Sequence, residues 1–128
     1  MTNGQLFTPE AWSHWQKLHQ SIKIVAISID AATADIYRVG RRGGKLQKPL
    51  DNLAFISQLR ADGQLDCLEI CLVVQKLNFH EIPDFIRLGK VFGVDPISFA
   101  HFCDWGTYGP EDPMVFLGNI SLSISSTP

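Results

Sequence analysis

The chain has 128 residues, of which 45% are hydrophobic and 19% are charged, and its formal net charge is −2. These values indicate one globular domain with a buried core and exclude a disordered polar chain. The small negative charge argues against a nucleic-acid partner, and no apolar run is long enough to cross a membrane. With no signal pattern at the N-terminus, we expect a cytoplasmic protein.

The first predicted elements are a helix and a buried strand. Thr8 can cap a helix that starts at Pro9, and Glu10 complements the positive end of the helix dipole. Apolar residues then recur at helical spacing as far as His19. Residues 22–30 follow as an apolar run with β-branched side chains on both faces, which predicts a strand buried on both sides, as in a parallel sheet.

Helices and strands are expected to alternate along the rest of the chain. The expected elements are a helical turn over residues 34–39, a helix from about Pro49 to Gly63, a strand over 68–75, a helix from about Glu81 to Gly93, and a strand over 96–102. The predicted buried stripe of the helix that starts near Pro49 consists of Leu50, Leu53, Ala54, Ile56 and Leu59.

This order predicts an α/β fold with three parallel strands joined by helical crossovers. Asn78 precedes Glu81 by three residues, which is the spacing of a capping box at the start of the last of these helices. We place the folded domain at residues 1–107, and we expect residues 108–128 to form a short helix and a flexible tail.

The three cysteines raise the question of an iron–sulfur site. Cys67 and Cys71 have a spacing found in cluster ligands, but the position of the next ligand is Val74. Residues four apart on a strand share a face, and free cysteine is a common core residue. We therefore expect reduced thiols, with Cys67 and Cys71 as core residues, and we assign no metal ligand and no catalytic residue.

Polar side chains follow the first two predicted strands. Ser28 and Asp30 end the first strand, and Gln75 and Asn78 follow the second. Parallel strands present their carboxyl ends at the same edge of a sheet, where α/β proteins bind ligands. In the Arg-Arg-Gly-Gly loop, the guanidinium of Arg41 or Arg42 could pair with a ligand carboxylate held there. Local capping by Asp30 and a simple glycine turn are the structural alternatives.

Taken together, several segments resemble the second half of a radical S-adenosylmethionine (radical SAM) enzyme barrel, covering strands four to six between residue 2 and about residue 107. Thr2-Asn3-Gly4 resembles the end of the third strand of that family, and Ser28-Ile29-Asp30 the end of the fourth. The remaining matching segments are Ala31-Ala32-Thr33, Tyr37, Arg41-Arg42-Gly43-Gly44, Asn52-Leu53, Leu59-Arg60, Val73-Val74-Gln75, Asn78-Phe79 and Asp104-Trp105-Gly106.

The resemblance implies a truncated part of a six-stranded (β/α) barrel that binds S-adenosylmethionine. It places Ser28 and Asp30 along that ligand, Arg41 or Arg42 at its carboxylate, and Val74, Gln75 and Asn78 toward the adenosine. In the family, a Cys-x-x-x-Cys-x-x-Cys loop holds the [4Fe–4S] cluster, and this chain lacks that loop. The resemblance therefore implies part of an S-adenosylmethionine-cleaving enzyme that is inactive alone.

Two other functions stay open from the sequence. The chain could be a non-catalytic βα interaction module, or a small domain that binds an anion through its arginine loop. Exposed sheet edges invite pairing with another strand. The expected partners are accordingly a missing N-terminal half of the barrel, or a second copy of the chain joined through these edges.

Overall fold

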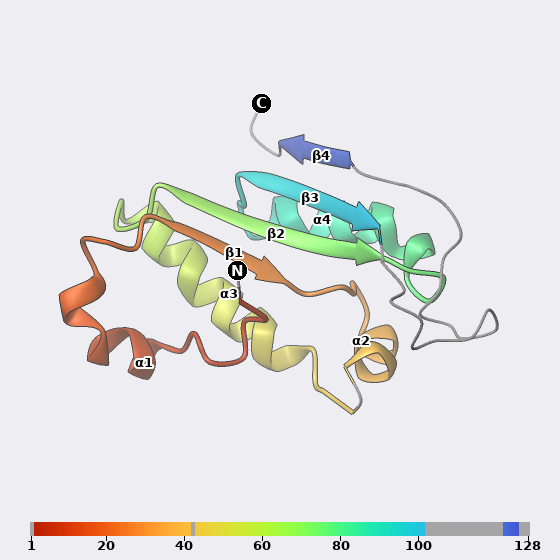
Figure 1. The fold of residues 1–128 in the computed structure, drawn as a ribbon, viewed down its shortest axis with the longest axis horizontal. Helices are drawn as coiled ribbons and strands as arrows, with labels where there is room; N and C mark the ends of the chain where they lie inside the picture. The colour runs from red at the N-terminus through yellow and green to blue at the C-terminus, as the bar shows by residue number, and fades with distance from the viewer. Residues whose placement is uncertain (1, 42, 102–121, 126–128) are drawn as a thin grey trace.

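The fold is a single sheet with helices packed on one face (Figure 1). The computed structural model describes residues 2–41, 43–101 and 122–125. Its elements are α1 (Pro9–His14), η1 (Gln16–Leu18), β1 (Ile24–Ser28), α2 (Ala34–Gly40), α3 (Gln47–Ala61), β2 (Cys67–Val74), η2 (Phe79–Glu81), α4 (Ile82–Val91), β3 (Pro96–His101) and β4 (Leu122–Ser125). Among these described helices, none is long and apolar enough to span a bilayer.

The predicted α/β fold with three parallel strands is confirmed. The strand order is β1-β2-β3-β4, and β1 pairs with β2, and β2 with β3, in parallel. Ile27, Ile70 and Ile97 lie side by side across these three strands. Because the three strands are parallel, their carboxyl ends lie at the same edge of the sheet, and the connections between them contain helices.

The fourth strand is a difference from the sequence prediction. β4 pairs antiparallel with β3, with Ile97 opposite Ile124. The sequence predicted a flexible tail here, but apolar residues and serine alternate in β4 with the period of a strand. The edge of β3 supplies the backbone partners that stabilise this strand. The helix predicted in the same terminal segment, and Cys103 and Trp105 before it, lie outside the described residues.

The N-terminal helix begins as predicted but is shorter. Thr8 Oγ1 accepts a hydrogen bond from the Ala11 backbone N–H at 3.0 Å, and Pro9 is the first helical residue. Helix α1 ends at His14, and the helical spacing to His19 continues as the separate turn η1. The ring of His19 stacks on Trp12, with centroids 3.9 Å apart, which ties η1 back onto α1.

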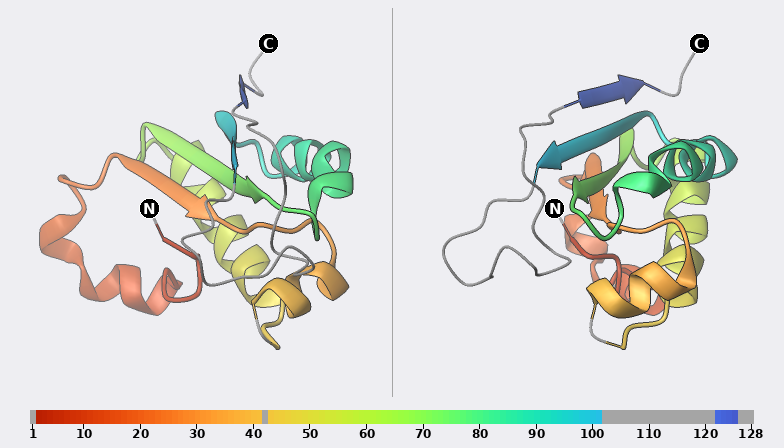
Figure 2. Two further views of the ribbon diagram at one scale, coloured as in Figure 1. Left: turned by 45° about the vertical axis from the view of Figure 1, so that its right-hand side comes forward. Right: turned by 90° about the vertical axis from the view of Figure 1, so that its right-hand side faces the viewer.

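Only one face of the sheet is fully buried, which corrects the prediction of strands buried on both sides. Helices α3 and α4 cover this face (Figure 2), and the side chains packed beneath them are those of Val25, Ile27, Leu68, Ile70, Leu72, Ile97 and Phe99. The other face, called here the open face, is less buried and carries mainly small or polar side chains, such as Ala26, Ser28, Glu69 and Ser98. Ile24, Cys71 and Val73 are its larger apolar side chains, and of these only Cys71 is buried. No described helix covers the open face.

Helix α3 buries a stripe that differs in part from the predicted one. Leu53, Ile56 and Leu59 are buried, but Ala54 is exposed and Leu50 is only partly buried. Asn52 is buried instead, because its side-chain amide donates to the Gly4 carbonyl at 2.5 Å. This bond fixes the N-terminal segment against α3. Beyond the helix, Gly63 has φ +80, the left-handed stop expected at a helix C-terminus.

The contact between α4 and β3 gives a test of this packing. A Cβ atom at Gly89 would lie 2.5 Å from Cδ1 and 2.9 Å from Cγ1 of Ile97, which is fully buried. Gly89→Ala should therefore lower the free energy of unfolding by about 1–3 kcal/mol through overpacking, despite the better helix propensity of alanine. Urea unfolding measures this effect. The exposed neighbour Lys90→Ala is the control and should change stability by less than about 0.5 kcal/mol; a stabilised Gly89→Ala variant would contradict the packing.

Candidate functional site

The candidate site lies at the carboxyl ends of β1 and β2. Ser28 pairs with Cys71 at the end of β1, and the Ile29 N–H donates to the Cys71 carbonyl at 3.1 Å, which carries the pairing one residue further. The structure brings together four of the predicted site residues here. They are Ser28, Asp30, Gln75 and Asn78, and they are called the rim below.

Asp30 joins the two strands and the arginine loop. Its φ is +63, a left-handed conformation that aspartate tolerates better than most residues. Oδ1 accepts from the Val73 backbone N–H at 2.7 Å, and the Ser28 hydroxyl donates to the same oxygen at 3.1 Å. Oδ2 pairs with Arg41 Nη2 at 2.9 Å. The interpretation of Asp30 as a cap of the following helical turn is therefore wrong, since its carboxylate binds across to β2 and Arg41.

Asn78 is the fully buried member of the rim. Its Oδ1 accepts from the Gln75 backbone N–H at 2.8 Å. Its Nδ2 donates to the carbonyl of Asp30 at 2.9 Å and to that of Val73 at 3.0 Å. With all three bonds made to backbone, Asn78 positions the two strand ends and is not available to a ligand. This also corrects the predicted capping box, since the Asn78 side chain is used at the end of β2.

Glu81 is a site residue that sequence reasoning misassigned. Its carboxylate is buried and accepts from the Ala32 backbone N–H at 2.8 Å and from the Thr33 hydroxyl at 2.5 Å. These partners lie in the loop after β1, 49 and 48 residues away in sequence. The local spacing to Asn78 suggested a helix cap, and no sequence signal pointed to this contact.

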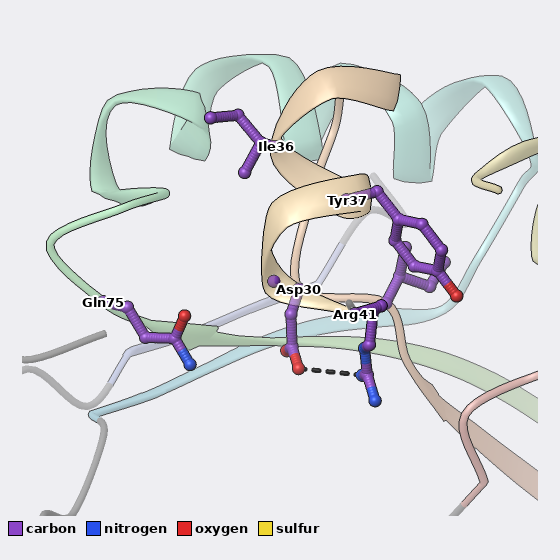
Figure 3. Close-up of a pocket in the computed structure, with 7 residues that line it drawn as sticks. Asp30, Ile36, Tyr37, Arg41 and Gln75 are labelled. Carbon is purple, nitrogen blue, oxygen red and sulfur yellow. Dashed lines mark hydrogen bonds and ion pairs between the residues drawn. The ribbon is translucent and has the colours of Figure 1, made fainter. Parts of the chain in front are cut away.

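Arg41 faces the rim. Residue 41 ends α2, and its Nη2 donates to the Ser28 carbonyl at 3.0 Å as well as to Asp30. The guanidinium and the Asp30 carboxylate point toward each other, with Gln75 on the far side of Asp30 (Figure 3). The Arg41 side chain is 30% exposed, and its Nη1 and Nε make no hydrogen bond to the part of the chain that the structure describes. Arg42 lies outside the described residues.

Two hollows adjoin Arg41. One, of about 160 Å³, is lined by Asp30, Tyr37, Arg41 and Gln75, together with the apolar side chains of Ile29 and Ile36. The second, of about 380 Å³, shares Tyr37 and Arg41 with the first and is otherwise lined by Asn3, Gln5, Gly43 and Gly44. Tyr37 is held between them by Gln5, whose Nε2 donates to the phenol oxygen at 2.6 Å. Arg41 thus stands in the wall of both hollows.

Val74 does not present its side chain to these hollows. It is fully buried in the core with the other residues on the helix-covered face of β2. A ligand near this position would contact the main chain, whereas the Gln75 side chain lines the smaller hollow.

The described cysteines do not fit a [4Fe–4S] cluster. Cys71 is buried, as expected of a core residue, whereas Cys67 is only partly buried, and both are on strand β2 rather than on a loop. Burial raises the pKa of both thiols, and nearby carboxylates add to this, so the thiolate that binds iron is disfavoured. Within residues 2–41, 43–101 and 122–125, no three metal-binding side chains converge.

The comparisons with known proteins concern the fold. No family model matches the chain, and no curated protein matches it. A solved structure of TYW1, a radical SAM enzyme, with a lysine–pyruvate adduct bound, superposes with a TM-score of 0.55 and 20% sequence identity. The chain therefore has the fold of part of the TYW1 chain. The match covers 80% of this chain and 31% of the TYW1 chain, so the chain spans about a third of that protein.

The charge state of Asp30 gives a test of the rim. Burial raises the pKa of Asp30, and the Val73 N–H, Arg41 and Ser28 only partly oppose it. The folded protein therefore binds the proton more tightly than the unfolded chain, whose Asp pKa is about 3.9. The stability that Asp30 contributes is greatest below that value and is lost as the pH rises through the folded pKa.

The Asp30→Asn variant removes this titration. As the pH falls toward the unfolded pKa, wild type should gain stability relative to Asp30→Asn, as measured by urea unfolding of both proteins at a series of pH values. The difference in free energy of unfolding between wild type and Asp30→Asn could instead be independent of pH, or shift in favour of the variant on acidification. Either result would show that burial does not raise the pKa of Asp30.

The Glu81→Gln variant tests the hydrogen bonds by which Glu81 joins the start of α4 to the loop after β1. The neutral amide keeps one acceptor oxygen, so the two charge-assisted bonds to Ala32 and Thr33 are replaced by weaker neutral ones, and we expect a loss of about 1–3 kcal/mol of stability. The control is Glu10→Gln in the exposed first turn of α1, which should cost no more than about 1 kcal/mol. Equal losses in thermal or urea unfolding would mean that Glu81 does not join the two loops.

Proposed function

We propose that this chain forms part of a radical SAM-type barrel and that its rim binds S-adenosylmethionine, with Arg41 holding the methionine carboxylate. The observation that carries this proposal is the position of Arg41. A cation fixed at the carboxyl ends of parallel strands, in the wall of two hollows, is where an α/β protein is expected to bind an anionic ligand group.

The guanidinium has donors left for a ligand. Nη2 already bonds to Ser28 and Asp30, which fixes the plane of the group. Nη1 and Nε, without hydrogen-bond partners in the described part of the chain, form the fork that pairs with a carboxylate through two parallel bonds. Fixing Arg41 in advance also reduces the side-chain entropy lost when a ligand binds.

The other predicted site residues have different roles in this proposal. Gln75 offers its amide to the adenosine from the wall of the smaller hollow, and Val74 contributes only its main chain. Ser28 and Asp30 hold Arg41, and Asn78 is a positioning residue because its fully buried side chain bonds only to backbone groups.

The proposal concerns binding and not turnover by this chain. A [4Fe–4S] cluster supplies the electron for reductive cleavage of S-adenosylmethionine in the radical SAM family, and the described cysteines do not fit one. We propose that the chain alone is inactive and that it needs a cluster-bearing segment to take part in catalysis.

Calorimetry with the 128-residue chain tests the proposal. S-adenosylmethionine should bind about ten-fold or more tightly than 5′-methylthioadenosine, which lacks the carboxylate and amino groups, because a charge-assisted pair contributes about 1.5–3 kcal/mol. Arg41→Ala should abolish this preference. Lys45→Ala, which removes an exposed cation of the same loop, should leave it unchanged.

Two results would contradict the proposal. One is the absence of binding heat for S-adenosylmethionine with a wild-type chain that is folded by circular dichroism. The other is an equal preference in Arg41→Ala and wild type. If acetate or phosphate instead displaces S-adenosylmethionine at comparable concentration, the rim is a general anion site and the adenosine is not recognised.

A further inference from the structure

The two hollows beside Arg41 differ in charge. The smaller one contains the Asp30 carboxylate and the apolar side chains of Ile29 and Ile36. The larger one is lined by polar side chains and glycine, and none of the described residues that line it is acidic. A ligand carboxylate in the smaller hollow would meet the like charge of Asp30, whereas in the larger one it would meet the guanidinium without that repulsion. The larger hollow is therefore the better place for an anionic group.

Tyr37 adds a hydrogen-bond donor beside Arg41. The two residues are one helical turn apart, and the Arg41 N–H donates to the Tyr37 carbonyl at 2.8 Å, so both side chains leave α2 on the same side (Figure 3). Tyr37 is only 2% exposed, and its phenol oxygen accepts from Gln5 Nε2 at 2.6 Å. A phenol also has one O–H to donate, and nothing in the described part of the chain accepts it. This O–H is available to a ligand in the larger hollow, which Tyr37 lines.

Gln5 is held in place by its own segment and by α3. Its N–H donates to Asn3 Oδ1 at 3.0 Å, and its carbonyl accepts from the amide of the buried Asn52 at 3.3 Å. The Gln5 side chain thus reaches the phenol from a fixed main chain and occupies an acceptor position of the oxygen, which leaves the O–H to turn toward the hollow. Donors oriented in advance reduce the entropy lost when a ligand binds.

We propose that the larger hollow receives the carboxylate of the ligand, that this carboxylate accepts hydrogen bonds from Arg41 and from the Tyr37 O–H, and that Gln5 is the positioning residue that directs this O–H. The inference rests on the function proposed above and adds the direction of the ligand. The carboxylate lies toward Tyr37 and the adenosine toward Gln75, on opposite sides of the pair formed by Arg41 and Asp30. The ligand class is a compound with a free carboxylate, since an ester or amide lacks the charge that the guanidinium neutralises.

Two side-chain amides report on the two hollows, because Gln5 lines the larger and Gln75 the smaller. Their NMR signals are followed in the 128-residue chain during titration with three compounds. S-adenosylmethionine should shift both amides. The compound 5′-methylthioadenosine, which lacks the carboxylate, should shift only Gln75, and L-methionine, which lacks the adenosine, should shift only Gln5.

Removal of the phenol hydroxyl tests the role of Tyr37. Tyr37→Phe keeps the ring and should weaken S-adenosylmethionine binding about ten-fold, because a hydrogen bond to a charged group is lost, and should leave 5′-methylthioadenosine binding unchanged. Gln5→Leu should also weaken S-adenosylmethionine binding, but not further in the Tyr37→Phe background, since Gln5 acts through the phenol. Gln58→Leu removes an exposed amide of α3 and is the control, which should bind as wild type does.

The outcomes separate this inference from the function on which it rests. If S-adenosylmethionine shifts Gln75 but not Gln5, or if 5′-methylthioadenosine shifts Gln5, the rim binds its ligand but the carboxylate is not in the larger hollow. Equal affinity of Tyr37→Phe and wild type would overturn the inference in the same way. If L-methionine shifts Gln5 while neither adenosine compound shifts Gln75, the carboxylate site stands and the adenosine part of the proposed function fails. If no compound shifts either amide, both fail.

Discussion

The buried amide of Asn78 holds together the part of the molecule on which the candidate site depends. It bonds to the backbone of Asp30 after β1, and of Val73 and Gln75 at the end of β2. Each bond is made away from water, so losing one would leave a buried backbone group without a partner. This tie fixes the backbone of Asp30, and Asp30 in turn orients the guanidinium of Arg41.

The two faces of the sheet have different roles. Valine, isoleucine and leucine pack under α3 and α4, whereas the open face carries alanine, serine and glutamate. In the described residues the helices cover one face of the parallel strands, an arrangement compatible with the wall of a (β/α) barrel. The superposition with 31% of a TYW1 chain agrees with this fold.

The sequence predicted what is encoded locally. The bounds of β2 and β3 were correct to within one residue at each end, because apolar runs bounded by turn residues determine them. The stop at Gly63 and the Thr8 cap are local in the same sense. Predictions failed where partners are distant in sequence: Glu81 binds a loop 49 residues away, and β4 exists only because β3 offers its edge. The contact of Arg41 with Asp30 likewise depends on the orientation of α2.

The most direct test of this account is the hydrogen exchange of the Asn78 side-chain amide, followed by NMR in the 128-residue chain. With both Nδ2 protons donated to buried carbonyls, they should exchange far more slowly than those of the exposed Asn3, which serves as an internal reference. Exchange of Asn78 at the rate of Asn3 would show that the ends of β1 and β2 are not joined in this way, and the site built on them would be lost with that contact.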